Sequence, residues 1–220
     1  MSVFGILLNY YPALLGGLLV SLELFLSVSI LGIFFGVAFG MLGARNPIAG
    51  QVIRIISFLV AGIPLLVLLY WFYYPFQQLL DISISPFLTA VLTLGIVNTA
   101  AIAELVRGIL ADFPKQYIAA ARMAGLSSNQ IFVRIQFPMV FRQTIPSLLT
   151  TQLFILQCTL FASLISVQEI FRVAQNLNAM LYRPIEIYTA LAIFFMLMLA
   201  PLYYLAHLLK ENFTRDFSEN

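Results

Sequence analysis

Long segments without charge are the feature that most constrains the fold of this 220-residue chain. Four of them contain no Asp, Glu, Lys or Arg, and a fifth, Ala13–Ala44, contains only Glu23. The four uncharged segments are Ile55–Leu80, Ile82–Ala103, Gln143–Gln168 and Ile187–Ala206. An α-helix needs about 20 apolar residues to cross the hydrocarbon core of a bilayer. We therefore predict an all-α membrane protein with five transmembrane helices.

The overall composition also indicates a lipid environment. Hydrophobic residues make up 62% of the sequence and charged residues only 9%, with a mean hydropathy of +1.00. A soluble domain carries about 25% charged residues. This chain has too little polar surface to face water, so lipid must cover much of it. We expect one transmembrane domain over residues 1–220, because no linker or low-complexity tract divides the sequence.

The basic residues are distributed unevenly between the two sides of the predicted spans. Two of the eleven, Arg172 and Arg183, fall in one outer loop, and nine fall on the other side. The nine are Arg45, Arg54, Arg107, Lys115, Arg122, Arg134, Arg142, Lys210 and Arg215. Lys and Arg are enriched on the cytoplasmic side of membrane proteins. We therefore place the C-terminus in the cytoplasm and the N-terminus outside. The net charge of +2 gives no reason to expect nucleic-acid binding.

The longest polar passage, Asp112–Pro146, lies between the third and fourth predicted spans. Within it, Tyr117–Ala124 is rich in alanine, which is a strong helix former. Gly125 suits the left-handed residue that often ends a helix. Ser127 and Gln130 then match a capping box, which predicts the start of a second short helix.

We expect this second helix to run to about Arg134 and to be stopped by Pro138. Two short helices joined by a tight glycine turn would form a compact knob within a loop of about residues 112–142. The alanines at 119, 120, 121 and 124 leave the first helix slim enough to enter a groove. An ordinary amphipathic surface loop is the alternative interpretation of the same residues.

Three glycines recur at four-residue spacing in the first predicted span, at Gly32, Gly36 and Gly40. Small residues on one helix face let a second backbone approach closely. Glycine is also common in membrane helices that make no such contact. The spacing alone leaves both interpretations open.

The knob resembles the EAA loop of permease subunits in bacterial ABC importers. The shared pattern is A-A-x-x-x-G, nine residues and then I-x-F-P, which here comprises Ala120-Ala121, Gly125 and Ile135-Gln136-Phe137-Pro138. The likeness covers most of the chain and narrows to the polar amino acid uptake group. The R-G-T-P-L, E-I-x-R-G and T-S-L…V-P-E-L motifs of that group resemble Gly62-Ile63-Pro64-Leu65, Glu104-Leu105-Val106-Arg107-Gly108, and Thr159 with Val167-Gln168-Glu169-Ile170.

The resemblance implies the type I ABC importer permease fold, with a cytoplasmic two-helix coupling loop that docks into a cleft on an ATPase. The residues implied in ATPase coupling are Ala119, Ala120, Ala121, Arg122, Gly125, Leu126 and Arg134. It further implies a second permease subunit, identical or homologous, and an extracytoplasmic solute-binding protein. A dimer of ATP-binding cassette ATPases would bind ATP and Mg²⁺. The chain would then lie in the bacterial cytoplasmic membrane and import a polar amino acid by alternating access.

The chain departs from the family pattern at several positions. The glutamate of the family loop falls at Ala119, and the arginine of R-G-T-P-L falls at Ala61. Many members carry Glu, Lys and Asp in the binding region, where this chain has Thr151, Gln157 and Cys158. These neutral groups favour an acidic or amide substrate, namely glutamate, aspartate or glutamine, over a cationic one.

The sequence offers no catalytic constellation. A phosphate-binding G-x-x-x-x-G-K-[ST] loop is absent, since neither Lys115 nor Lys210 is followed by Ser or Thr. His207 and Cys158 are each the only residue of their type, so no His/Cys cluster offers a metal site and no internal disulfide forms. We expect no enzyme activity and no cofactor on this chain, with ATP hydrolysis on a separate partner.

Polar residues inside the predicted spans are the candidates for a transport role. Glu104 and Arg107, three residues apart on a helix, are expected to form an ion pair that is either structural or part of a gate. Other polar groups either bond neighbouring helices or contact the substrate. These are Thr151, Gln157, Cys158, Thr159, Asn98 and Thr99.

Three other functions compete with this prediction. One is an importer of a basic amino acid or another small polar solute. A second is a secondary transporter driven by an ion gradient, which would want an ionisable relay that spans two, four and five lack. A third is a non-transporting scaffold, which would not need the spacing of the knob.

Overall fold

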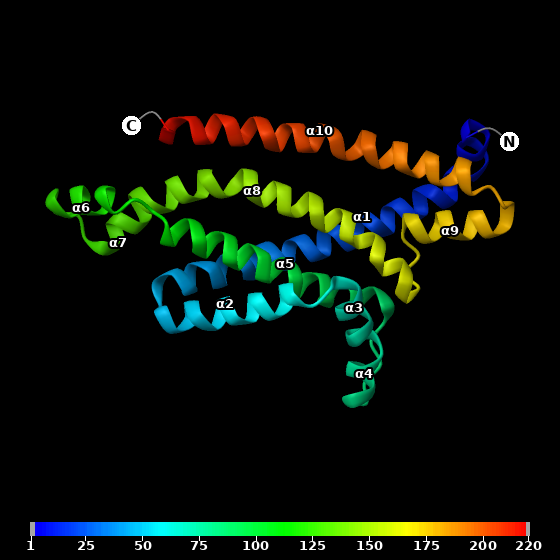
Figure 1. Ribbon diagram of the computed structural model, residues 1–220, viewed down its shortest axis with the longest axis horizontal. Helices are drawn as coiled ribbons and strands as arrows, with labels where there is room; N and C mark the ends of the chain where they lie inside the picture. Colours follow the sequence, from blue (N-terminus) through cyan, green and yellow to red (C-terminus); the bar gives the residue numbers. More distant parts are fainter. Residues whose placement is uncertain (1–2, 219–220) are drawn as a thin grey trace.

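The computed structural model describes residues 3–218, and within these residues every regular element is helical. Long helices run side by side along the long axis of the molecule (Figure 1). They are α1 (Val3–Arg45), α5 (Pro86–Ala111), α8 (Phe137–Cys158) and α10 (Pro184–Ser218). Each of the four forms, or belongs to, a helical stretch that is long and apolar enough to cross a membrane.

The second predicted span is two helices rather than one. α2 (Pro47–Gly62) meets the segment Leu65–Leu79, which comprises α3 (Leu65–Tyr73) and α4 (Pro75–Leu79), at an angle of 94°. Only together are the two long and apolar enough to cross a membrane. The break falls at Pro64, because proline has no N–H for the helix ladder. The described residues thus hold four continuous spans, and a fifth if the bent pair crosses as one.

Helix α5 lies at the centre of the packing and contacts α1, α2, α3 and α8. Its closest neighbour is α1, along the glycines at four-residue spacing. A Cβ atom added to Gly36 would lie 2.6 Å from Ile102 Cβ, and one added to Gly40 would lie 2.7 Å from Val106 Cβ. Gly32 faces the Asn98 side chain in the same way. The prediction of close packing through these glycines is confirmed.

A buried apolar cluster joins α1, α3, α5, the end of α8 and the 3-10 helical segment that follows it, Thr159–Ile165. Its members include Leu24, Leu69, Leu94, Ile155 and Ile165, all nearly or fully shielded from solvent. Lipid tails are as apolar as these side chains, so the cluster is held by close packing rather than by exclusion of water.

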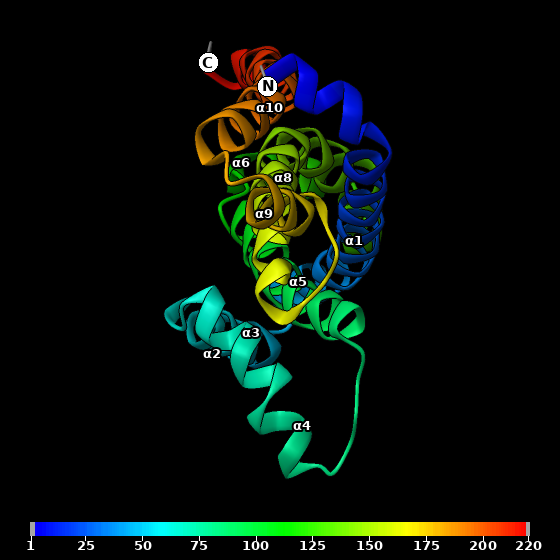
Figure 2. The same cartoon turned by 90° about the vertical axis from the view of Figure 1, so that its right-hand side faces the viewer.

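The two ends of the helix bundle carry different elements. The short helices α6 (Lys115–Met123) and α7 (Ser128–Ile131) lie at the same end as the last turns of α10 (Figure 1). The start of α1 and the helix α9 (Ile170–Leu181) lie at the opposite end. In the end-on view of Figure 2, α4 projects away from the other helices, whereas α3 packs against α5. The start of α1 and the last turns of α10 therefore lie at opposite ends of the bundle, as expected for a chain that crosses the membrane an odd number of times.

The glycine contact generates a stability prediction. Gly36→Val places a branched side chain against Ile102, and overpacking of this kind costs about 1–3 kcal/mol. Gly16 lies on the same helix with nothing within 4 Å of an added Cβ, so Gly16→Val is the matched control. We expect a lower thermal midpoint in detergent for Gly36→Val and little change for Gly16→Val. Equal midpoints for the two variants would contradict the close contact of α1 with α5.

Candidate functional site

The knob, here residues 115–131, comprises α6, a glycine turn and α7. Gly125 ends α6 with φ = +82°, in the left-handed region. Its N–H donates to the Arg122 carbonyl at 3.0 Å, and the Leu126 N–H donates to the Ala121 carbonyl at 3.1 Å. These two bonds form a Schellman motif, which satisfies carbonyls that the helix end leaves free. The turn predicted at Gly125 is confirmed.

The capping box at the start of α7 is also present. The Ser127 N–H donates to Gln130 Oε1 at 2.9 Å, and the Gln130 N–H donates to Ser127 Oγ at 3.4 Å. Both bonds lie within four residues, so the sequence alone fixes the geometry of this end of the knob. The knob is therefore an ordered element rather than an irregular loop.

The prediction that Pro138 stops the second helix is wrong. α7 continues into a π-helical segment, Phe132–Gln136, and then into α8. The Phe137 N–H donates to the Phe132 carbonyl five residues back. Proline lacks an N–H and crowds the carbonyl four residues before it, and the wider π turn accommodates both effects. The knob is thus joined to the fourth span by one helical path over residues 128–165.

The outward face of α6 is small and apolar. Ala119, Ala120 and Ala124 are exposed, and the Met123 side chain is 84% exposed. Ala121 is buried on the other side of the helix. An exposed methionine surrounded by alanines, at the tip of a membrane protein, is suited to contact with another protein. The sequence prediction missed Met123, although its place three residues after Ala120 puts it on the same helix face.

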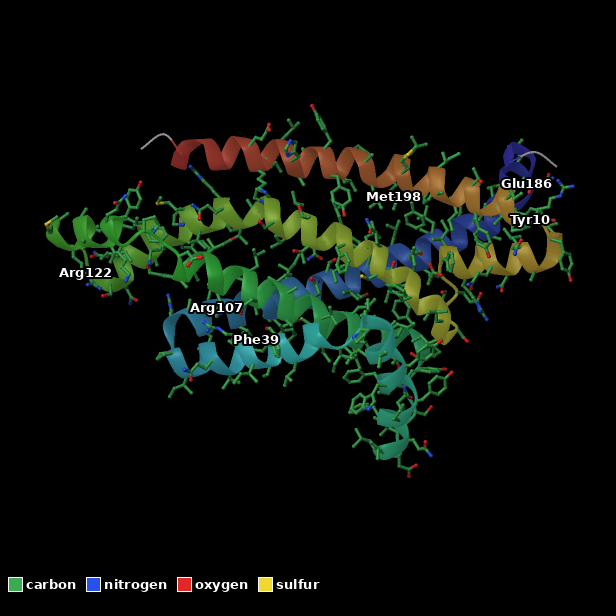
Figure 3. The ribbon with its side chains drawn as sticks, viewed as in Figure 1. Tyr10, Phe39, Arg107, Arg122, Glu186 and Met198 are labelled. Atoms are coloured by element: carbon green, nitrogen blue, oxygen red, sulfur yellow. The ribbon has the colours of Figure 1, made fainter. Side chains whose placement is uncertain are left out.

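The charged residues assigned to the knob point to its surface. Arg122 lies at the tip (Figure 3), and it is exposed, as is Arg134 in the π segment. Leu126 is half-buried below the turn. The structure therefore brings all seven residues proposed for coupling onto the knob or the segment directly after it.

The π segment contacts the end of the first span. The Arg45 guanidinium lies over the Phe132 ring, 3.9 Å from its centroid, in a cation–π contact. An apolar cavity of about 160 Å³ lies beside it between α1, α5 and α8, with Phe132 and Phe137 in its wall. A π turn next to unfilled space gives this junction room to change shape.

A second feature is a cleft between α2, α5 and α8. It has a volume of about 620 Å³ and is lined by polar groups from three helices, including Arg54, Glu104 and Thr151. The ion pair predicted between Glu104 and Arg107 is present on its α5 wall. Arg107 Nε donates to Glu104 Oε2 at 2.9 Å, and a second guanidinium nitrogen donates to Oε1, so the pairing is bidentate.

Comparisons with known proteins agree with this architecture. Residues 32–218 match the family described as the binding-protein-dependent transport system inner membrane component. The chain belongs to this family. The permease is similar to HisQ of Escherichia coli K12, a histidine/lysine/arginine/ornithine transport system permease protein, with 30% identity over 190 residues that cover 81% of this chain and 83% of HisQ. It is also similar to a probable glutamine ABC transporter permease protein, GlnP of Bacillus subtilis 168, with 29% identity over 74% of each chain.

Solved structures share the fold of the permease. A chain in a structure described as an amino acid ABC transporter with histidines superposes with a TM-score of 0.83 and 22% identity, over 94% of this chain and 96% of that one. A chain of the MetNI methionine ABC transporter in inward-facing conformations gives a TM-score of 0.73 at 18% identity, over 94% and 97%. The all-α type I importer fold predicted from the sequence is confirmed.

The candidate substrate residues of the permease do not form one group. Thr151 borders the cleft with Glu104, whereas Thr99 lines a separate apolar cavity of about 390 Å³ that includes Phe39. Figure 3 labels Phe39, which lines the apolar cavity, and Arg107, which pairs with Glu104 of the cleft. Gln157 is half-buried, and its amide donates to the Tyr203 hydroxyl of α10 at 3.3 Å.

The remaining candidates lie inside the packed helices. Asn98 is fully buried and exchanges two amide hydrogen bonds with Gln152, at 3.3 and 3.1 Å, while its nitrogen also donates to the Val28 carbonyl. Cys158 is 2% exposed, and the hydroxyl of Thr159, the first residue after α8, donates to the Leu156 carbonyl in the last turn of α8. Asn98 therefore ties α1, α5 and α8 together.

The end of the permease opposite the knob has a buried carboxylate at Glu169. It caps α9 by accepting the N–H groups of Phe171 at 2.9 Å and Arg172 at 2.7 Å, while Ser21 Oγ of α1 accepts the Ile170 N–H. Burial raises the pKa of Glu169 to about 7, against the opposing effect of the two backbone N–H groups. Among the described residues, no three His, Cys, Asp or Glu side chains lie close enough to hold a metal ion.

Proposed function

We propose that this permease is the transmembrane subunit of an ATP-driven importer for polar amino acids. The knob carries the proposal, because its turn and cap build a rigid surface at the one end of the molecule where basic residues collect. Family membership supports it, as do the names of HisQ and GlnP, which are permeases of amino acid transport systems.

The proposed assembly contains two permease subunits, identical or related, and two ATP-binding cassette ATPases in the cytoplasm. The permease sequence has no phosphate-binding loop, so ATP and Mg²⁺ would bind to the ATPases. A solute-binding protein would deliver the substrate from outside. The small apolar face of Ala119, Ala120 and Met123 is the surface that would enter the ATPase cleft.

Coupling would pass through the π segment. ATP binding draws the two ATPases together and moves the docked knobs, and this favours one conformation of the permease only if the ligand binds the two states with different affinity. The knob is continuous with α8 and touches α1 through Arg45 and Phe132. A movement of the knob would thus reach two membrane helices at once.

For the substrate, we propose glutamate, aspartate or glutamine ahead of a basic amino acid. The family positions that carry charge are neutral here. The Thr151 hydroxyl donates to the Ser147 carbonyl at 2.9 Å and could still accept a hydrogen bond, and the half-buried Gln157 amide could donate or accept one. HisQ is named for the transport of histidine, lysine, arginine and ornithine, and this supports a basic amino acid as the alternative substrate. Competition of unlabelled glutamine and arginine for uptake distinguishes the two.

Docking of the knob gives the experiment that tests the function. Gly125→Val forces a branched residue into a left-handed conformation, a strain of about 1–3 kcal/mol, and Ala120→Arg puts a long cation on the contact face. We expect both variants to insert in the membrane but to retain roughly tenfold less ATPase on co-purification, since tenfold corresponds to about 1.4 kcal/mol. Their binding-protein-stimulated ATPase activity should fall in parallel.

Ala44→Arg is the matched control for the docking experiment. Ala44 is an exposed alanine at the same end of the molecule, on α1 rather than on the knob. The same substitution there should leave ATPase recovery unchanged. Wild-type recovery with both knob variants, or equal loss with Ala44→Arg, would refute the docking surface.

We further propose that the knob lies in the cytoplasm and α9 outside. Cysteines at Asn176 of α9 and Ser128 of α7 test this, because both positions are exposed. The native Cys158 is 2% exposed and should give little background. An impermeant thiol reagent added to intact cells should label Asn176→Cys and not Ser128→Cys. The reverse labelling would invert the topology.

A further inference from the structure

The cleft between α2, α5 and α8 has the size and lining of a binding site. At about 620 Å³ it falls within the range of roughly 300–1,000 Å³ found for small-molecule sites. Small side chains such as Ala61, Ala100 and Ala101 form much of its wall. Polar groups occur on all three helices, with Arg54 and Ser57 on α2, Glu104 on α5 and Thr151 on α8.

The charges in this cleft do not balance. Glu104 is neutralised by the bidentate bond from Arg107 on its own helix. Arg54 has no hydrogen bond, ion pair or aromatic contact within the described part of the chain, although its charge is close enough to act through space on Glu104. Its helix neighbours Ile53 and Ile55 are apolar. The cleft therefore carries one cation in excess, in a segment where ionisable groups normally pair or face water.

The cleft lies in the inner half of the bundle. Arg54 is the eighth residue of α2, and Glu104 precedes the last residue of α5 by seven, so each lies about 10 Å from the knob end of its helix. A solute that crosses from outside would meet Thr151 near the middle of α8 and then the two charged groups. Their order suits a site occupied shortly before release.

We propose that Arg54 binds the α-carboxylate of an amino acid in transit, with Glu104 accepting hydrogen bonds from its α-ammonium group. This inference rests on the proposed import of amino acids and assigns the head-group site within it. A guanidinium matches a carboxylate with two parallel hydrogen bonds. Glu104 retains free acceptor capacity, since its side chain is 41% exposed despite the pairing with Arg107. The side chain of the substrate then points toward Thr151.

The proposal accounts for the neutral residues on span four. Thr151, Gln157 and Cys158 leave a zwitterion without charged partners on α8, and the cleft supplies the Arg54 cation from α2 and the remaining acceptor capacity of the paired Glu104 from α5. Because both groups address atoms common to all α-amino acids, this site should select for the head group and not for the side chain. A compound without the α-carboxylate should not occupy it.

Substitution of Arg54 is the first test, with the permease reconstituted together with its ATPase and binding protein. Arg54→Gln should reduce ATP-dependent uptake roughly ten- to hundredfold, the range expected for losing a charge-assisted hydrogen bond. Binding-protein-stimulated ATPase activity should persist, because the knob is untouched. Arg54→Lys should recover part of the uptake, since lysine keeps the charge but not the paired geometry.

Arg142→Gln is the matched control, because Arg142 is an exposed cation on α8 that does not line the cleft. It removes the same charge from the same side of the membrane and should transport normally. Wild-type uptake by Arg54→Gln would refute the proposal. Equal losses in Arg54→Gln and Arg142→Gln would also refute it, by showing that both arginines only anchor the protein at the membrane surface.

Protection of a cysteine in the cleft is the second test, and it does not need an active Arg54 variant. Ser57→Cys should react with N-ethylmaleimide, and a mixture of L-glutamine, L-histidine and L-arginine should slow the reaction at least about threefold, as occupancy near two-thirds would give. The corresponding amines without the carboxylate, 4-aminobutanamide, histamine and agmatine, should not protect. Equal protection by the amino acids and by the amines, or protection by neither set of compounds, would refute the proposed site.

The two tests separate this inference from the function it rests on. If the wild-type complex shows no ATP-dependent amino acid uptake, the proposed function fails. If wild-type uptake is present and Arg54→Gln and cysteine protection behave as in the refuting outcomes, only the head-group site fails. Loss of complex assembly in Arg54→Gln, together with unprotected Ser57→Cys, would assign Arg54 to subunit contact and overturn the proposal.

Discussion

The contact of α1 with α5 is the constraint on which the rest of the permease depends. Hydrophobic collapse does not drive helix association in lipid, so backbones must approach closely enough for dispersion and polar bonds to act. Gly36 and Gly40 allow that approach, with Ile102 and Val106 of α5 against the bare backbone. At Gly32 the same closeness lets the Asn98 amide reach the Val28 carbonyl while it remains bonded to Gln152 of α8. Three spans are thereby fixed to one another.

Fixing α5 also fixes both functional features. Its half nearer the knob carries Glu104, which lines the cleft, and Arg107, which pairs with Glu104. The knob begins at Lys115, a few residues beyond the end of α5 at Ala111. The connection from the knob to α8 is less tightly packed, because it runs through the π segment Phe132–Gln136 beside an apolar cavity. One side of the knob is therefore anchored and the other has room to move. This asymmetry suits a part that converts docking into a change of helix packing.

Much of this arrangement followed from local sequence rules. Uncharged length predicted the spans, and Gly125 and Ser127 predicted the turn and cap, because those bonds close within a few residues. The prediction that Pro138 ends the second short helix was wrong, because the π-helical turn before it accommodates the proline within a continuous helix. No local sequence pattern predicts a π turn at this position. The 94° bend at Pro64 lies within the uncharged segment Ile55–Leu80, and its angle depends on what α3 packs against.

The candidate transport residues were harder to predict, because their roles depend on helices far apart in the sequence. Spacing placed Thr159 and Cys158 beside Gln157, yet the fold buries the first two and turns the third toward Tyr203. It also gave no sign that Arg54 would line the same cleft as Glu104, since they lie fifty residues apart on different helices. Such pairs become visible only when the helices are assembled.

ATP-dependent uptake into vesicles tests the central claim most directly. The permease would be reconstituted with its ATPase and solute-binding protein, and uptake of labelled glutamine, glutamate, histidine and arginine would be measured with ATP on the ATPase side or with an imposed proton gradient. The account predicts accumulation of at least one of these amino acids with ATP and none with the gradient alone. Uptake driven by the gradient in the absence of ATP would contradict it.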